Sequence, residues 1–445
     1  MKNKVLTGLL LVLIGGWGSL SAQSAGSNYS RQVNTLIGTK GVGLTSGYLY
    51  PGATYPYGMV QFTPSYFSKR SGFVINQLSG GGCEHMGNFP TFPVKGKLKM
   101  SPDNILNYRI NISEEKGHAG YYEAMVQEDI KAKLTVTERT GMASYEYPAD
   151  QQYGTVIIGG GISATPIEQA AIVITAPNKC EGYAEGGNFC GLRTPYKVYF
   201  VAEFDTDALE SGTWKRNELK PNTTFAEGEY SGVYFTFDVN KKKNIQYKIG
   251  VSYVSVENAR ENLKAENTGW DFLQIQNQAE SKWNHYLGKI EVEGTNPDRT
   301  TQFYTHLYRS FIHPNVCSDV NGEYMGADFK VHKSRSKHYT SFSNWDTYRT
   351  QIQLLSILDP EVVSDIVISH QLFAEEAGGA FPRWVMANIE TGVMQGDPTP
   401  ILISNAYAFG ARNYDPKPIF KTMRKGAEES PGDTIIFNGR KFKSY

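Results

Sequence analysis

Residues 341–396 read SFSNWDTYRTQIQLLSILDPEVVSDIVISHQLFAEEAGGAFPRWVMANIETGVMQG, and this stretch sets the architecture of the second half of the chain. It predicts two successive helices, at 347–358 and 360–376, because the Asp-Pro pair at 359–360 supplies an N-cap followed by proline at the first helical position. A Gly-Gly loop then leads into the segment PRW at 382–384. Aromatic, carboxylate and guanidinium groups recur where these helices end, and a ligand with apolar ring faces and many hydroxyls needs that mixture.

Helices are predicted to dominate the chain from Asp298 onward. Phe303, Leu307 and Phe311 recur every four residues and give an apolar stripe along one helix face. Further helices are expected at 399–412 and after a second Asp-Pro pair at 415–416. Helices of similar length joined by loops rich in functional side chains indicate an α/α barrel built from helical hairpins.

The first half of the chain has the pattern of β-structure instead. Apolar and polar residues alternate with period two, or short apolar runs occur, at 130–137, 155–158, 171–174, 197–204, 232–239 and 245–256. Many short strands without intervening helices indicate a large antiparallel β-sandwich. Residues 258–266 and 270–286 lack this alternation and predict a helical linker between the two parts.

Composition and the N-terminus limit the class of protein. The chain carries 44 Lys and Arg against 44 Asp and Glu, so no basic surface for nucleic acid is expected. Lys2 and Lys4 precede an apolar run at 5–14 and small residues at 19–25, the pattern of a secretory signal peptide cleaved near Ala22. That run is too short to span a membrane. The mature protein is therefore expected in the periplasm or outside the cell, with no membrane span.

The four cysteines are Cys83, Cys180, Cys190 and Cys317. Export permits disulfides, and Cys180 and Cys190 flank a Gly-rich segment that a disulfide between them would close as a loop. Their spacing matches no zinc site. Cys83 precedes Glu84 and His85, but sequence neighbours rarely form a catalytic pair, so a packed thiol is the more economical interpretation.

Several segments, in this order, resemble glycoside hydrolase family 92, the calcium-dependent exo-acting α-mannosidases known from Bacteroidetes. The similarity runs from residue 33 to the end of the chain, and its number and order of motifs carry it. The segments are VNTLIGT (33–39), YPGATYPYGMVQ (50–61), LSGGGC (78–83), HAGYY (118–122), LYR (307–309), WDTYR (345–349), PRW (382–384) and ET (390–391).

The resemblance implies a fold and a domain division: an N-terminal antiparallel β-sandwich, a helical linker and an (α/α)6 barrel, here partial. The limits expected are 1–25 for the signal peptide, 26–257 for the sandwich, 258–297 for the linker and 298–445 for the start of the barrel.

The resemblance also implies an inverting hydrolysis, in which two carboxyl groups flank the sugar with room for a water molecule. In the family the general acid, the general base and the calcium ligands lie later in the barrel, and no segment here matches those motifs. The catalytic residues are therefore unknown, with acid, base and calcium ligands expected beyond Tyr445, and no metal ligand is assigned within the chain. The chain is interpreted as a C-terminally truncated member that is itself inactive.

Ten residues are predicted to bind the sugar. Trp345 is expected to line the subsite of the terminal sugar and Asp346 to bind its hydroxyls, although an acidic residue at a helix start also complements the helix dipole. Arg383 and Trp384 either hold the sugar or form a structural pair. Glu390 and Asp397 are expected to hold loops or a hydroxyl rather than to act as acid and base. The remaining candidates are Met394, Cys83, Glu84 and His85.

Three functions remain open from the sequence. The first is an exo-α-mannosidase of the α-1,2 type that acts on mannans or N-glycans, with mannose-containing glycans as its partners. The second is an inverting disaccharide phosphorylase, which needs phosphate-binding donors beside the acid. The third is a non-catalytic carbohydrate-binding protein. A homo-oligomer is also left open.

Overall fold

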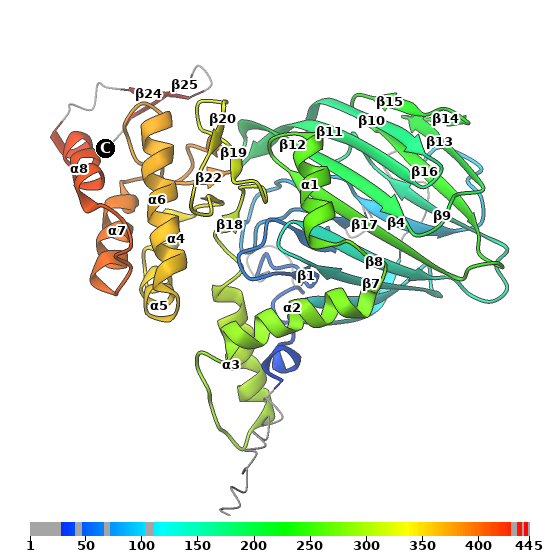
Figure 1. Cartoon of the computed structure of the whole chain (residues 1–445), viewed down its shortest axis with the longest axis horizontal. Coiled ribbons are helices and arrows are strands. Elements are labelled where there is room, and N and C mark those ends of the chain that lie inside the picture. The colour runs from blue at the N-terminus through cyan, green and yellow to red at the C-terminus, as the bar shows by residue number, and fades with distance from the viewer. Residues whose placement is uncertain are drawn as a thin grey trace, which may run out of the picture.

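The computed structural model describes residues 28–40, 47–65, 72–102, 111–428, 434–437 and 440–443. The predicted signal peptide, at 1–25, and Tyr445 lie outside these residues. A large β-sandwich is followed by a group of helices, with connecting helices and several short strands at the junction (Figure 1). The predicted order of a β-sandwich followed by a helical part is confirmed, whereas the exact domain limits stay predictions.

Two antiparallel sheets form the sandwich within the described residues. The eight-stranded sheet has the order β1 (Ala53–Thr54), β2 (Gln61–Pro64), β3 (Phe73–Val74), β4 (Thr91–Lys95), β9 (Tyr153–Ile158), β16 (Ser231–Asp238), β13 (Glu210–Lys215) and β14 (Glu218–Pro221). The nine-stranded sheet has the order β15 (Phe225–Glu227), β10 (Ile167–Ala176), β11 (Lys179–Phe189), β12 (Leu192–Phe204), β17 (Asn244–Ser252), β8 (Thr140–Glu146), β7 (Ile130–Val136), β6 (Tyr121–Val126) and β5 (Ile112–His118).

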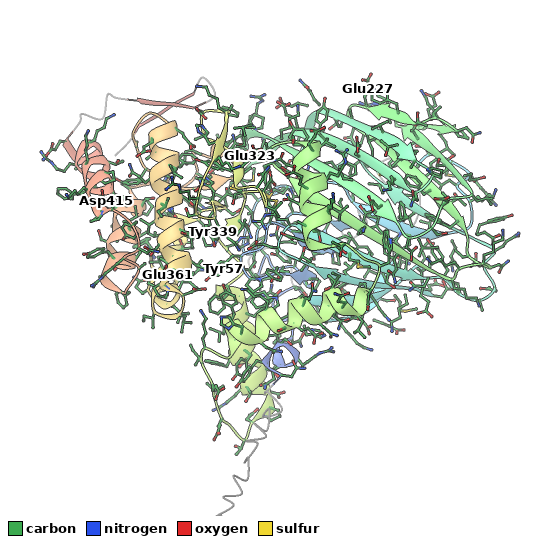
Figure 2. The ribbon with its side chains drawn as sticks, in the orientation of Figure 1. Tyr57, Glu227, Glu323, Tyr339, Glu361 and Asp415 are labelled. Atoms are coloured by element: carbon green, nitrogen blue, oxygen red, sulfur yellow. A yellow bond between two sulfur atoms is a disulfide. The ribbon has the colours of Figure 1, made fainter. Side chains whose placement is uncertain are left out.

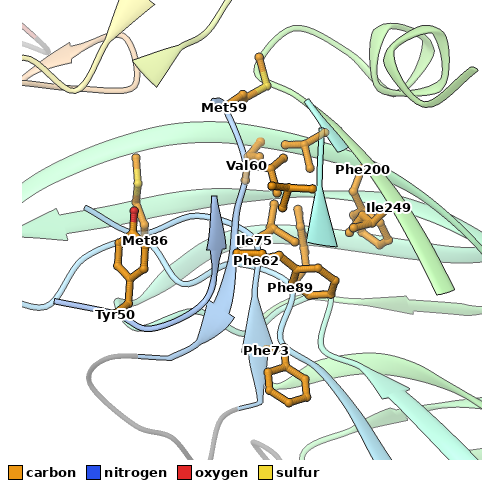
Figure 3. Close-up of a cluster of buried hydrophobic side chains, with 14 of the residues drawn as sticks. Tyr50, Met59, Val60, Phe62, Phe73, Ile75, Met86, Phe89, Phe200 and Ile249 are labelled. Carbon is orange, nitrogen blue, oxygen red and sulfur yellow. The ribbon is translucent and has the colours of Figure 1, made fainter. Parts of the chain in front are cut away.

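The core of the sandwich lies between the two sheets. Alternating side chains point inward, and Phe62, Phe73 and Phe89 from one side meet Phe200 and Ile249 from the other (Figure 3). All five are fully buried. Removal of this much apolar surface from water is the main stabilising term of such a fold.

The strand predicted at 245–256 ends earlier, at Ser252. Ser255 ends the extended segment because its side chain accepts a hydrogen bond from the backbone N–H of Asn258 and thereby caps helix α1 (Val256–Glu266). Apolar residues stand on both sides of this cap, at Val254 and Val256, so apolar alternation alone does not reveal it.

Three helices connect the sandwich to the rest of the chain: α1, α2 (Phe272–Leu287) and α3 (Pro297–Ser310). A 3-10 turn, η1 (Tyr29–Gln32), packs against α2 and α3. Helix α1 lies on β12 and β17, while α2 crosses β7 (Figure 1). Each of these helices uses the N-cap that its sequence offers.

The helical part contains α4 (Asn344–Thr347), α5 (Gln351–Leu358), α6 (Pro360–Glu376), α7 (Pro398–Ala408) and α8 (Pro416–Glu428). The short strands around it pair as β18 (Asn315–Val316) with β21 (Tyr339–Thr340), β19 (Glu323–Met325) with β20 (Val331–Lys333), β22 (Val385–Met386) with β23 (Ile389–Glu390), and β24 (Thr434–Phe437) with β25 (Arg440–Lys443).

The single helix predicted at 347–358 is two helices. Thr350, between α4 and α5, has φ 65° and ψ −40°, and the backbone N–H of Gln351 donates to the carbonyl of Arg349 at 2.8 Å. This is a γ-turn with positive φ, which is rare and strained for a β-branched residue. No Gly or Pro marks it in the sequence, so the helical pattern conceals it.

Aromatic rings join the sandwich to the helical part. Tyr57, at the edge of the sandwich, lies at the junction opposite Tyr339 of β21 (Figure 2). Its ring centre is 6.2 Å from that of Tyr339 and 5.9 Å from that of Phe311, with near-perpendicular planes in both pairs. Edge-to-face packing of this kind stabilises an interface and fixes the rings that form it.

Among the described helices, none combines the length and the apolar composition that a membrane crossing requires.

Candidate carbohydrate-binding site

The sandwich side of the candidate site is held by a disulfide between Cys83 and Cys190, with a Cα–Cα distance of 5.2 Å. The predicted Cys180–Cys190 bond is wrong. The segment between them is strand β11, not a loop, so their Cα atoms are separated by roughly 3.3 Å per residue of extended chain. Cys180 is a buried free thiol in the core. A bonded Cys83 also leaves no thiol there for nucleophilic chemistry.

His85 braces this loop from inside. It is buried, its Nε2 accepts the backbone N–H of Leu78 at 2.8 Å, and its Nδ1 lies 2.7 Å from the carbonyl of Cys83. Burial lowers the pKa of His85 to about 4, so the ring is neutral at physiological pH. Glu84, by contrast, is exposed. Of these two neighbours, only Glu84 is placed to reach a ligand in solution.

Trp384 closes the contact between the sandwich loop and the helical part. Its ring centre is 4.5 Å from that of Phe189, which directly precedes Cys190. Phe189 in turn meets the edge of His85, with ring centres 5.9 Å apart. Trp384 is only 6% exposed, so its indole packs as a wall rather than standing open as a platform.

Arg383 and Glu390 form a closed structural pair beside Trp384. Glu390 is buried and accepts three backbone N–H groups, from Arg383 at 2.7 Å, Trp384 at 3.2 Å and Gly392 at 2.9 Å. The Arg383 guanidinium donates to the carbonyls of Val393 and Gly396. Glu390 therefore ties together the two chain ends of the β22–β23 hairpin, which leaves it poorly placed to transfer a proton to a substrate.

Met394 and Asp397 lie on the rim that follows. Met394 is exposed and has φ 62°, so the backbone turns sharply there. Desolvation by the surrounding chain raises the pKa of the Asp397 carboxyl to about 6, against the opposing charge of Arg383. Asp397 also precedes α7, without a side-chain bond to the helix.

Trp345 and Asp346 of the short helix α4 form an open group with Arg349, which lies just after that helix. Asp346 is exposed and accepts a hydrogen bond from the hydroxyl of Ser343. The guanidinium of Arg349 lies 5.4 Å from the ring centre of Trp345 and 5.1 Å from that of Tyr348. A carboxylate, a guanidinium and an indole therefore reach solvent together, where a ligand with hydroxyls and an apolar ring face finds all three.

Asn344 anchors that open group, and sequence reasoning missed it. Its buried side-chain amide donates to Thr399 Oγ1 at 2.7 Å and to the carbonyl of Pro382 at 3.2 Å, and it lies 2.9 Å from Nε2 of His370. A β-bridge between Ser343 and Trp384 adds a second tie. One amide thus joins α4, α6, α7 and the segment that carries Arg383.

A further link runs between the LSGGGC loop and the helical part. The backbone N–H of Ser79 donates to Nε2 of His313 at 2.7 Å, and Nδ1 of His313 lies 2.7 Å from the side-chain oxygen of Asn315. Burial lowers the pKa of His313 to about 4. Neither His313 nor His370 stands out in the sequence, because each occurs alone among apolar neighbours.

The ten predicted residues thus gather at one junction but in two orientations. Cys83, His85, Trp384 and Glu390 are built into its wall, with Arg383 bonded to the same turn. The others reach solvent from neighbouring segments: Trp345, Asp346, Glu84, Met394 and Asp397. The residues that sequence reasoning missed, Phe189, Asn344, His313 and His370, are the supports between these two sets.

The side chains present can be compared with the ligands that a calcium ion needs. Within the described residues, the group with metal-ligand spacing comprises Asp328, His332 and Glu376, whose donor atoms lie within 4.8 Å of one another. Calcium takes six to eight oxygen ligands. This group offers an imidazole, and Glu376 already accepts from Tyr324 and from the backbone N–H of Ala327. It does not fit a resident calcium ion.

The fold and the site define a class: a two-part carbohydrate-active protein with its candidate site between a sandwich loop and a helical region. Residues 32–252 match the family described as the glycosyl hydrolase family 92 N-terminal domain, and residues 258–445 match the glycosyl hydrolase family 92 catalytic domain. The chain belongs to glycosyl hydrolase family 92, which confirms the family inferred from the motifs.

Known proteins agree with this assignment. A family GH92 α-mannosidase from Bacteroides thetaiotaomicron is 25% identical, with a TM-score of 0.83 over 91% of this chain and 57% of that one. A family GH92 inverting mannosidase from the same organism is 24% identical, with a TM-score of 0.79 over 93% of this chain and 57% of that one, and shows the shared fold.

The chain covers a smaller share of a curated relative than of these solved structures. An uncharacterized secreted glycosidase from Arthroderma benhamiae is 26% identical over 363 residues, which cover 72% of this chain and 45% of the relative. The chain therefore spans about half the length of the relatives that it matches.

Proposed function

We propose that the protein carrying this sequence is an exo-acting α-mannosidase, and that the described residues form the wall that holds the terminal mannose. The exposed Asp346 beside Trp345, on a helix that Asn344 fixes from below, carries this proposal. Family membership supplies the reaction class, hydrolysis of a glycosidic bond. Inversion is proposed in line with the similar inverting mannosidase from Bacteroides thetaiotaomicron. Terminal mannose on mannans or N-glycans, joined by an α-1,2 linkage, is the proposed substrate.

Each exposed side chain has a role in this proposal. Asp346 accepts hydrogen bonds from two neighbouring sugar hydroxyls, since a carboxylate offers two oxygens in one plane. Trp345 covers the apolar face of the ring, and Arg349 holds the indole by stacking on it. Glu84 reaches toward the next sugar from the disulfide-bonded loop.

Hydrolysis needs a general acid and a general base on opposite sides of the sugar. Glu390 is held by three backbone N–H groups, and Asp397 precedes a helix, so neither is proposed as a member of that pair. We therefore expect the 445-residue chain to bind mannosides without releasing mannose. Calcium dependence is part of the proposal through family membership, and the described residues contribute binding and orientation of the sugar.

Export to the periplasm or beyond is also proposed. The Cys83–Cys190 disulfide supports it, because such bonds persist in oxidising compartments. The description of the fungal relative as secreted is in line with it.

Calorimetric titration of the 445-residue chain with α-1,2-mannobiose and with methyl α-glucoside tests the binding role. The mannobiose is expected to bind and the glucoside is not. In parallel, the product of the natural gene is incubated with α-1,2-mannobiose, and proton NMR follows the first mannose released, which inversion makes the β-anomer. No binding by the chain and no release by the gene product overturns the proposal. Binding without release by either favours a carbohydrate-binding protein.

A further inference from the structure

A hollow of about 650 Å³ opens between the outer face of the nine-stranded sheet and the start of α2. Three aromatic side chains line it, Tyr121 from β6, Trp270 from the α1–α2 connection and Phe272 from α2. Between them lie amide side chains, among them Asn244 and Gln246 of β17. The hollow shares no residue with the candidate site described above.

The rings of this hollow are held in place by the protein behind them. The ammonium of Lys248 lies 4.4 Å from the ring centre of Trp270, and that ammonium donates to the carbonyl of Asn267 at 3.0 Å. The ring of His118 stacks on Tyr121, with centres 4.9 Å apart and planes 21° apart. One face of the Trp270 ring and one face of the Tyr121 ring are therefore covered, while all three rings remain partly exposed. Fixed rings bind a flat apolar surface with little loss of side-chain entropy.

The polar groups of the hollow have unused hydrogen-bonding capacity. The buried side-chain oxygen of Gln246 has no hydrogen-bond partner among the described residues. The side-chain oxygen of Asn244 accepts from Ser144 at 2.7 Å, and its amide N–H groups donate to none of the described residues. The Gln246 oxygen is buried out of reach of a ligand in the hollow, whereas Asn244 is half-buried and leaves its amide N–H groups open to a ligand. A sugar hydroxyl can accept hydrogen bonds from these N–H groups.

Charge and shape narrow the ligand further. Lys133 and Asp271 are the ionisable residues that line the hollow, one of each sign, so neither an anion nor a cation is favoured. A second hollow of about 650 Å³ meets the first at Asp271 and Leu273 and continues along α2 past Asn277. Two adjoining hollows suit a chain of sugars better than a single one.

We propose that this surface, from Trp270 along α2, is an accessory binding site for a neutral, hydroxyl-rich glycan chain. It holds a polymeric substrate on the sandwich independently of hydrolysis. The choice of α-mannan as the first probe rests on the proposed function. The site itself is inferred from its rings and amides, independently of that function.

Affinity electrophoresis in native gels containing α-mannan tests this site. The Asp346→Asn chain serves as the parent, so that the candidate site does not mask retention. The parent is expected to be retarded, and Trp270→Ala in that parent is expected to raise the dissociation constant at least tenfold. Asn244→Ala is a second variant that leaves the rings intact, with an expected rise of about threefold. Phe420→Ala, which removes a more exposed aromatic ring from α8, is the control and is expected to change nothing.

Retention that Trp270→Ala and Asn244→Ala both leave unchanged overturns the proposal, as does a parent that neither α-mannan nor a second neutral polysaccharide, galactomannan, retards. If Trp270→Ala does not fold, as circular dichroism reports, Asn244→Ala decides. Retention lost in Trp270→Ala while the product of the natural gene releases no mannose supports this site and contradicts the proposed function. Mannose release without retention does the reverse.

Discussion

Two groups of the same residue types face opposite ways in this molecule. Arg383, Trp384 and Glu390 turn inward: the carboxylate accepts three backbone N–H groups and the indole is buried against Phe189. Trp345, Asp346 and Arg349 turn outward, although they comprise the same three kinds of side chain. The difference lies in how many backbone N–H and C=O groups near each set lack a backbone partner and bind its side chains instead.

The charged groups of the inward set hydrogen-bond to the backbone of the hairpin that carries them, so they are not available to a ligand. The outward group stands on a four-residue helix whose own support comes from Asn344, one residue earlier. Its carboxylate and guanidinium therefore remain available to a ligand. Residue type decides which interactions are chemically possible, and the local backbone decides whether they are spent on the protein or on its ligand.

Acid should affect the inward side most. Burial lowers the pKa of His85, His313 and His370 to about 4, below the ordinary value of 6.5. Below pH 6.5 the unfolded chain therefore binds more protons, and stability falls as the pH drops from 6.5 to 4. Each histidine contributes up to about 1.4 kcal/mol per pH unit. Urea unfolding at pH 7.0 and pH 5.0 measures the loss in the free energy of unfolding. His370→Gln should make the difference between the two pH values smaller. Equal stabilities at the two pH values would show that these rings accept protons in the folded state.

Glu390→Ala should have the next largest effect, on stability alone. It leaves three backbone N–H groups without their acceptor, with an expected loss of about 3 kcal/mol or more in the free energy of unfolding. Glu390→Gln keeps an acceptor oxygen and should lose less. Urea unfolding measures both variants, and calorimetry on the folded fraction should show unchanged mannoside binding. A loss of affinity without loss of stability would place Glu390 among the ligand-binding groups.

Asp346→Asn should show the opposite behaviour. Mannoside affinity is expected to fall about 10- to 100-fold, because a charge-assisted hydrogen bond is lost. Stability should change by less than about 0.5 kcal/mol, since the side chain is exposed. Calorimetric titration and urea unfolding of the same preparation check both. Unchanged affinity would remove Asp346 from the site.

Thr350→Gly should have the smallest effect, and it should be stabilising. Glycine relieves the positive φ of the γ-turn, and about 1 kcal/mol remains after its greater loss of chain entropy on folding. Thermal unfolding compares the variant with the parent chain. A lower midpoint would mean that the Thr350 side chain contributes more than its backbone strain costs.

The elements of the fold were predictable where the signal is local. Alternation placed β7, β12 and β16, and the Asp-Pro pairs marked the starts of α6 and α8. The break at Thr350 was not predictable, since its neighbours keep a helical pattern. The disulfide was also missed, because it joins residues 107 positions apart, and the strand between Cys180 and Cys190 looked like a loop rich in glycine.

For the candidate site, the sequence could predict which residues belong to it, but not how they are oriented. Motif residues located both groups, but their orientation depends on partners distant in sequence, such as Phe189 for Trp384 and His370 for Asn344. A lone histidine in an apolar helix reads as core, and only its contacts reveal it as a support.

The Cys83–Cys190 bond also has a consequence for the order in which the protein is made. Both cysteines belong to the sandwich, whereas Trp384, which packs against Phe189 beside the bond, lies almost 200 residues later in the chain. N-terminal domains generally fold as units before later ones are synthesised. In a cell that exports this chain, the disulfide can close the sandwich side of the site before the residues of the opposite side have left the ribosome.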